Sequence, residues 1–241
     1  MQLVVTRPLE DARPLARRLE ALGHDVMLAP LMSIRRADRM TIPERNYQAV
    51  LITSANGARA LGGRPELARL KGATALVVGP SSAAAAARIG FSHIAEADGD
   101  VAALIASAIA LLRPAGGPLL YVSGAVTAGD LAGKLEASGF DIDRVVAYEA
   151  RPADRLPKAC AAAMAGGKVE GVLLFSPRSA RIWTALVSAA DLTDAAAQLT
   201  HYCLSENVAD AVLSGLGAEV ATLVSPLSEE GSLLAMIPAP A

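Results

Sequence analysis

Short apolar runs alternate with helical patterns along the whole chain. Residues 3–6 (LVVT) predict a strand, and the apolar spacing of residues 10–23 predicts an amphipathic helix after it. Further strands, each followed by a small-residue turn and a helical stretch, are predicted for these runs: AVLITS, ATALVVG, PLLYVSG, GVLLFS, HYCLS and EVATLVS. Strands that alternate with helices are typical of an α/β fold with a mainly parallel sheet.

Three sequence blocks occur twice, which indicates two similar domains. The strand–turn–helix phrase at 51–61 (LITSANGARAL) returns at 173–183 as LLFSPRSARIW. Two further blocks recur at similar spacing with the order of the three kept, ARRLEALGHDV as AGKLEASGFDI and VVGPSSAAAAARIG as CLSENVADAVLSGLG. A period this long is unlike the short repeats of solenoid proteins. We therefore predict two similar flavodoxin-like α/β domains with parallel sheets.

Length, composition and charge narrow the class of protein. The 241 residues suffice for two domains that each bury a core. Although 53% of residues are hydrophobic, no run reaches the ~18 apolar residues of a membrane helix, and the N-terminus lacks a signal-peptide pattern. A net charge of -2 and an aromatic content of 3% argue against a nucleic-acid partner. We expect a cytoplasmic protein that binds neither membrane nor nucleic acid.

Several catalytic and cofactor motifs are absent from the sequence. Cys160 and Cys203 have no metal or redox spacing, which is typical of buried free thiols. The three histidines, His24, His93 and His201, lie just before or within predicted strands, so we interpret them as structural. The chain has no GxGxxG, no GxxxxGKS/T and no GxSxG. We expect no metal and no cofactor, and a protein that acts by positioning with modest acid–base help.

Polar and small residues follow several of the predicted strands. In open α/β sheets, ligands bind outside the carboxyl ends of the strands, where helix N-termini attract carboxylates and phosphates. Any one of these turns is better explained by ordinary helix capping. Taken together, in two domains that face one another, they predict an anion-lined cleft. The turns are Thr53–Gly57, Gly79–Ser82, Ser123–Gly124, Ser176–Ser179 and Ser205–Asn207.

The ordered motifs resemble the uroporphyrinogen-III synthase family over nearly the whole chain. The resemblance is carried by VTRPLEDARPLARRLEALGHDVMLAPLMSI, ITSANGARAL, VVGPSSAAAAARIGF, YVSG with LAGKLEASGFDIDRVVAYEA, and FSPRSAR. It implies an enzyme of haem biosynthesis, a cofactor-independent hydro-lyase that cyclises hydroxymethylbilane to uroporphyrinogen III with inversion of ring D. Because this linear tetrapyrrole carries eight carboxylates, the resemblance also accounts for helix N-termini that line the cleft from both sides.

The resemblance further implies two α/β domains joined by a two-stranded connector. We expect a discontinuous domain of residues 1–33 with 152–241 and a contiguous domain of residues 34–151. The connector strands would lie near 32–38 and 145–153. We expect the protein to be a monomer that makes transient contact with the preceding enzyme of the pathway.

The turns and the resemblance together select the candidate site residues. Tyr148 matches the family tyrosine that assists departure of the substrate hydroxyl, although a strand tyrosine that anchors the hinge explains it equally well. Arg7 either binds a substrate carboxylate or pairs with a helix acid. The candidate substrate-binding residues are Arg7, Thr53, Ser54, Asn56, Ser81, Ser82, Ser123, Gly124, Ser176, Pro177, Arg178 and Ser205.

The sequence departs from the family pattern at two turns, and a different class of function stays open. Glu206 follows Ser205 where relatives have a glycine and hydroxyl residues, and this acid would repel a carboxylate. Ala128, Gly129 and Asp130 stand where many relatives carry an arginine. The alternative is a non-catalytic, two-domain cytoplasmic binding protein or sensor for a small anionic ligand.

Overall fold

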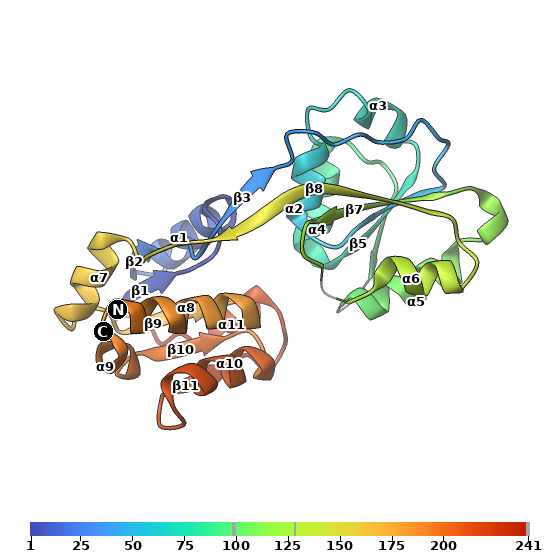
Figure 1. Cartoon of the computed structure of the whole chain (residues 1–241). Coiled ribbons are helices and arrows are strands. Elements are labelled where there is room, and N and C mark those ends of the chain that lie inside the picture. The colour runs from blue at the N-terminus through green and yellow to red at the C-terminus, as the bar shows by residue number, and fades with distance from the viewer. Residues whose placement is uncertain (98–99, 128, 240–241) are drawn as a thin grey trace. The chain divides into compact units, whose positions relative to one another are not determined.

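Apolar strands of the computed structural model form two separate sheets (Figure 1). The structure describes residues 1–97, 100–127 and 129–239. Two compact units are formed, the first by Met1–Ser33 with Arg151–Ala241 and the second by Ile34–Ala150. The predicted α/β class with parallel sheets is confirmed by the pairings of both units.

The first unit contains a five-stranded parallel sheet in the order β11-β10-β9-β1-β2. Its strands are β1 (Gln2–Val5), β2 (Asp25–Leu28), β9 (Gly171–Leu174), β10 (Thr200–Cys203) and β11 (Thr222–Val224). The apolar stripes of α1 (Leu9–Ala21) and α11 (Glu230–Ala235) pack on one face of the sheet. The other face is covered by α7 (Lys158–Ala165), α8 (Pro177–Ala189), α9 (Thr193–Ala197) and α10 (Glu206–Leu216).

The second unit contains a six-stranded sheet in the order β3-β8-β7-β4-β5-β6. Its strands are β3 (Met32–Arg36), β4 (Ala49–Ile52), β5 (Thr74–Val78), β6 (Ile94–Ala97), β7 (Leu119–Gly124) and β8 (Ile142–Pro152). One face carries α2 (Ala55–Leu61), α3 (Leu67–Leu70) and α4 (Gly79–Ile89). The other carries α5 (Val101–Leu111) and α6 (Leu131–Ala137), with the short helix η1 (Pro114–Gly116) before β7. In Figure 1 the helices accordingly lie on both sides of this sheet.

The two units have the same spatial plan with the chain cut at different places. The order β2-β1-β9-β10-β11 in the first unit corresponds to β8-β7-β4-β5-β6 in the second. The repeated block at the end of α1 therefore corresponds to α6, and the blocks that start α8 and α10 correspond to α2 and α4. Each unit combines blocks from both halves of the sequence, so a repeat in the sequence is not by itself a domain.

The strands β3 and β8 differ from the simple strand–helix alternation. The Ala37 amide donates to the Ala147 carbonyl at 2.9 Å and the Ala153 amide to the Leu31 carbonyl at 2.8 Å, so the two segments run antiparallel. The strand β8 begins at Ile142, earlier than the predicted 145, because its first half pairs with β7. The strand β6, with the short run IAEA, was missed by the sequence patterns.

Candidate functional site

Each unit has one point where the strand order reverses. In the first unit it lies between β1 and β9, and in the second between β4 and β7, which pair in parallel. Ligands of open α/β sheets bind at the carboxyl edge of such a point. The segments that follow these strands contain Arg7 and Ser176 in the first unit and Ser54 in the second, where Gly124 is the last residue of β7.

Tyr148 lies at the reversal point of the second unit, held by the turn after β4. Its hydroxyl donates to Ser54 Oγ at 3.1 Å. Ser54 caps α2, since its Oγ also accepts from the Asn56 amide at 3.0 Å. The Asn56 side chain in turn accepts from Arg59 at 2.7 Å. The structure thus brings together Ser54, Asn56 and Tyr148, three of the residues selected from the sequence.

Gly124 supports the other side of the Tyr148 ring. A Cβ atom added at Gly124 would lie 2.9 Å from Tyr148 Cζ and 3.1 Å from its hydroxyl oxygen, so only glycine leaves room for the ring. The Ala125 amide also donates to the Tyr148 carbonyl at 2.9 Å. Gly124, predicted to contact substrate, therefore positions the phenol.

Ser123 precedes this glycine, is fully buried and forms a hydrogen bond with Arg144. Its Oγ donates to the Val145 carbonyl at 3.3 Å and accepts from Arg144 Nε at 3.0 Å. Arg144 Nη2 also donates to the Gly124 carbonyl at 3.3 Å. Arg144 was not among the residues selected from the sequence. The strand β8 also contains Asp143, Glu149 and Arg151, so no sequence signal distinguishes Arg144.

Thr53 belongs to the same neighbourhood through Tyr121. Burial raises the pKa of Tyr121 above its ordinary value, whereas a hydrogen bond with Thr53 and the charge of Arg144 act to lower it. Tyr121 pairs in register with Arg144 of β8 and with Leu51 of β4, two residues before Thr53, so the three residues lie in the same part of the sheet.

Ser81 and Ser82, in the turn after β5, do not occupy the helix-cap position that the sequence suggests. The helix α4 begins at Gly79, so Ser81 and Ser82 belong to its first turns and do not cap it. Gly79 has φ of 71°, which glycine tolerates at this strand-to-helix turn. Ser82 is buried and Ser81 is exposed. A contact of either with substrate stays a prediction.

In the first unit, Arg7 is engaged by acids of two helices. Its Nη1 lies 2.6 Å from Glu230 Oε2 and its Nη2 3.6 Å from Asp11 Oδ2. The guanidinium also stacks 4.8 Å from the centre of the Phe175 ring. The structure therefore supplies the acid-paired arrangement that was one of the two interpretations of Arg7, and binding of a carboxylate there stays a prediction.

The turn after β9 is built as a helix cap. Ser176 and Ser179 form a reciprocal capping box, in which Ser176 Oγ accepts from the Ser179 amide at 3.1 Å. Pro177 occupies the first position of α8, with Arg178 after it. Ser205 occupies the corresponding position before α10 but makes no side-chain cap hydrogen bond.

Replacing Ser176 with alanine is expected to lower the free energy of unfolding by about 0.5–2 kcal/mol, because the Ser179 amide loses its acceptor. The exposed Ser188 of the same helix provides the matched control, and Ser188→Ala is expected to change stability little. Chemical denaturation of both variants measures the difference. Equal stability of the two would show that the cap contributes nothing, and complete loss of turnover in a folded Ser176→Ala protein would make its hydroxyl catalytic.

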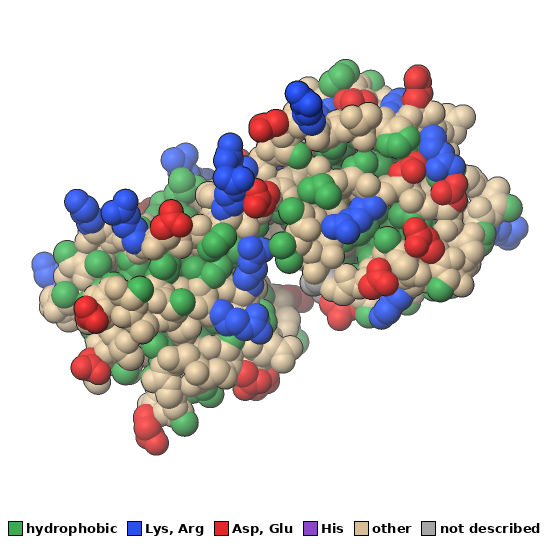
Figure 2. Space-filling model, in the orientation of Figure 1, with side chains coloured by type: hydrophobic (Ala, Val, Ile, Leu, Met, Phe, Trp, Pro, Cys, Tyr) green, Lys and Arg blue, Asp and Glu red, His purple; other side chains and the backbone are tan. Residues whose placement is uncertain are grey.

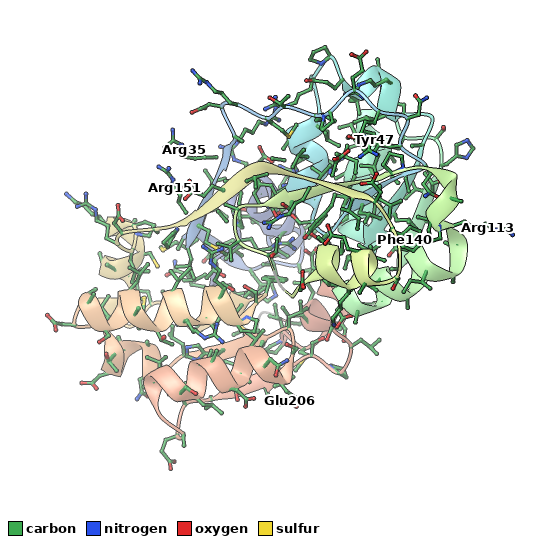
Figure 3. The ribbon with its side chains drawn as sticks, turned by 45° about the vertical axis from the view of Figure 1, so that its right-hand side comes forward. Arg35, Tyr47, Arg113, Phe140, Arg151 and Glu206 are labelled. Atoms are coloured by element: carbon green, nitrogen blue, oxygen red, sulfur yellow. The ribbon has the colours of Figure 1, made fainter. Side chains whose placement is uncertain are left out.

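The two turns at which the sequence departs from the family pattern, at Glu206 and around Asp130, differ in their local structure. Glu206 is exposed in the first turn of α10, where Figure 3 labels it, and its charge helps raise the pKa of Cys203 to about 12, after the larger effect of burial. Asp130 caps α6 by accepting from the Gly133 amide at 3.0 Å. Ala128 lies outside the described residues.

One groove near these turns lies between two helices and not at the sheet edge. A groove of about 610 Å³ runs between α8 and α10, lined by Pro177, Arg181, Thr184 and Asn207 among others. Of the selected residues, Pro177 alone lines it. Polar contacts at the sheet edges therefore define the candidate site better than this groove.

Further features of the described residues concern metal ligation, membrane-spanning helices and the state of the two cysteines. Within residues 1–97, 100–127 and 129–239, no three His, Cys, Asp or Glu side chains are grouped as metal ligands. Over the same residues, no helix has both the length and the apolar character needed to cross a membrane. Cys160 and Cys203 are buried free thiols, as predicted.

Comparison with known proteins points to one family. The family model described as uroporphyrinogen-III synthase HemD matches residues 13–226. The uroporphyrinogen-III synthetase of Helicobacter pylori 26695 has a similar structure, with 15% identity, a TM-score of 0.65 and coverage of 98% of this chain and 97% of that one. A mutant uroporphyrinogen III synthase of the extremely thermophilic bacterium Thermus thermophilus gives 19% identity, a TM-score of 0.53 and coverage of 98% and 96%. No curated protein matches the sequence closely enough to count as a relative.

Proposed function

Since the chain belongs to the uroporphyrinogen-III synthase family, an enzyme family of haem biosynthesis, we propose that it cyclises hydroxymethylbilane to uroporphyrinogen III with inversion of ring D. We further propose that it does so as a hydro-lyase without a cofactor. The match to residues 13–226 carries the assignment, because it spans segments of both units. No observation favours the alternative of a non-catalytic binding protein.

The first chemical step is loss of the substrate hydroxyl. The pyrrole nitrogen lone pair expels the oxygen, the carbon–oxygen bond breaks, and the oxygen leaves as water once it has gained a proton. The product is an electrophilic azafulvene, which a carbon atom of ring D attacks to close the macrocycle. For ring D to be inverted, the bond that joins this carbon to the bridge of the neighbouring ring must break and re-form at the other α-carbon of ring D, which then loses its proton. The protein must therefore assist the departure of the hydroxyl oxygen and hold the two ends of the linear tetrapyrrole in a defined arrangement.

Tyr148 is the residue that we assign to the leaving oxygen. A phenol can donate its proton or a hydrogen bond, and Tyr148 is held in place by Ser54 on one side and Gly124 on the other. Its hydroxyl already donates to Ser54 Oγ at 3.1 Å. When substrate is present, the same proton would turn to the leaving oxygen while Ser54 keeps the phenol oriented.

We propose that the carboxyl edge of each sheet offers groups that can bind substrate carboxylates. The long helices α4, α8 and α10 begin at these edges, and their free amides and partial positive charge attract anions. The hydroxyls of Thr53 and Ser205 would add neutral hydrogen bonds. On the face of the second unit that Figure 2 shows, acidic and basic side chains are interspersed, so binding would depend on individual groups.

The compartment, oligomeric state and partners of the enzyme follow from the same family assignment as proposals. We propose a cytoplasmic monomer with the linear tetrapyrrole as its ligand, in transient contact with the preceding enzyme of the pathway. The family assignment supports the small-molecule substrate.

The deciding experiment supplies enzymatically prepared hydroxymethylbilane to the purified full chain. Products are oxidised and the porphyrin isomers separated. We expect mainly uroporphyrin III with the protein, and uroporphyrin I, the spontaneous product, in its absence. Uroporphyrin I alone, formed by a folded protein, would refute the proposed reaction.

A further inference from the structure

Arg144 presents a guanidinium at the carboxyl edge of the second unit that the proposed reaction does not yet use. Its side chain reaches from β8 to the end of β7, where Nε is bound by Ser123 and Nη2 by the Gly124 carbonyl. Ser123 has no exposed surface and is itself bonded to the Val145 carbonyl. The two groups that bind the guanidinium, Ser123 Oγ and the Gly124 carbonyl, are therefore held in place by the sheet.

Two of the five N–H groups of this guanidinium are engaged by these contacts. The remaining donors, including both on Nη1, have no hydrogen-bond partner in the part of the chain that the structure describes. Among the same residues Arg144 forms no ion pair, whereas Arg45 of this unit pairs with both Asp141 and Asp143. Arg144 is thus a positioned cation that lacks a counter-ion among the described residues.

The position of this cation relative to Tyr148 follows from Gly124. The Gly124 carbonyl lies 3.3 Å from Arg144 Nη2, and a Cβ on the same glycine would lie 3.1 Å from the Tyr148 hydroxyl oxygen. Cation and phenol therefore contact different parts of one residue. The influence of both Arg144 and Tyr148 on the pKa of Tyr121 agrees with this proximity.

We propose that Arg144 binds a carboxylate of the anionic tetrapyrrole beside Tyr148 and thereby positions the reacting end of the substrate. The inference rests on the proposed function and deepens it. A guanidinium suits a carboxylate because its parallel N–H groups match the two oxygens. Anchoring by Ser123 and Gly124 reduces the side-chain entropy that binding would otherwise cost.

The test compares Arg144→Ala and Arg144→Lys with Arg113→Ala, a matched control in the same unit. Arg113 precedes β7 and so lies toward the amino end of that strand, and Figure 3 shows it at the outer edge of the second unit. We expect Arg144→Ala to raise KM for hydroxymethylbilane roughly 10- to 100-fold, the usual effect of losing a charge-assisted hydrogen bond. The lysine variant should recover part of this loss, and Arg113→Ala should behave as wild type.

A positioning role is separated from a structural one by two further readouts. Raising the salt concentration should increase KM less in Arg144→Ala than in wild type, because one charge contact is already gone. Ser123→Ala should raise KM by a smaller factor, and it should add little to Arg144→Ala in a double-mutant cycle. Thermal unfolding of each variant controls for folding.

Binding of uroporphyrin III, which carries eight carboxylates, provides a readout that needs no turnover. We expect its Kd, measured by fluorescence, to rise about 10-fold in Arg144→Ala. If Arg144→Ala and Arg113→Ala have equal KM and equal Kd, the inference is overturned while the proposed function stands. If wild type forms no uroporphyrin III, the proposed function fails, and the binding comparison still decides whether Arg144 holds a carboxylate.

Discussion

The Tyr148→Phe variant is expected to form uroporphyrinogen III more slowly by about 10²-fold or less, and the III isomer should remain the main product. General acids contribute ~10²–10⁴-fold in rate, but this hydroxyl leaves readily because the pyrrole nitrogen expels it, so the effect should fall at the low end. Phenylalanine keeps the ring against Gly124 and removes the hydrogen bond to Ser54. Inversion of ring D should persist, since the shape of the site governs it.

The measurement is the initial rate and the isomer ratio of purified variant and wild type. Tyr47→Phe is the matched control, because it makes the same chemical change in the same unit. Tyr47, which Figure 3 labels, precedes β4, whereas Ser54 follows it. The Tyr47 hydroxyl donates to Asp143 Oδ2 at 2.8 Å. Tyr47→Phe should cost some stability and leave the rate unchanged. A wild-type rate in Tyr148→Phe would make Tyr148 a hinge residue.

The protein is expected to lose about 3 kcal/mol of stability between pH 6.5 and pH 4 through a single buried histidine. Burial lowers the pKa of His201 from its ordinary 6.5 to about 4. Below pH 6.5 the imidazole of His201 is protonated in the unfolded chain, whereas in the folded protein it stays neutral until the pH falls to about 4. The stabilisation is therefore complete above pH 6.5 and is lost as the pH falls toward 4.

The contacts of His201 explain why the folded protein keeps it neutral. The ring has no exposed surface, and its Nε2 accepts from Trp183 Nε1 at 3.2 Å. Because an indole is only a donor, Nε2 must carry a lone pair and the imidazole proton sits on Nδ1. Protonation of Nε2 would break this bond and leave a charge among the apolar side chains of the first unit.

Denaturant unfolding at a series of pH values tests this expectation. His201→Gln removes the titration, so its stability should fall less between pH 6.5 and 4, whatever its absolute value. The exposed His93 offers the control, and His93→Gln should keep the wild-type pH dependence. Parallel pH profiles for wild type and His201→Gln would exclude His201 as the cause. A loss of this size matters because domains are stable by only about 5–15 kcal/mol.

The sequence by itself determined the class of fold and most of the helices and strands, although it missed the strand β6. Local periodicity suffices for this, as in the helix Leu9–Ala21, whose buried Ala12, Leu15 and Leu19 recur at helical spacing. The repeated blocks also indicated two similar sheets. The turns after the strands indicated Ser54 and Asn56, whereas the family resemblance indicated Tyr148. Such features are local because propensity, capping and turn chemistry act over a few neighbouring residues.

The tertiary structure decided how distant segments combine and which side chains meet. Leu3 lies beside Gly171 because backbone hydrogen bonds join β1 to β9, and such bonds carry no side-chain signature. In the same way, the contacts of Arg144 with Ser123, of Arg7 with Glu230 and of Trp183 with His201 depend on strand register and helix packing across the sheet. The local sequence does not determine these distances, so the role of a hydroxyl as a cap, as at Ser176, or as a support, as at Ser123, becomes visible only once the sheet has formed.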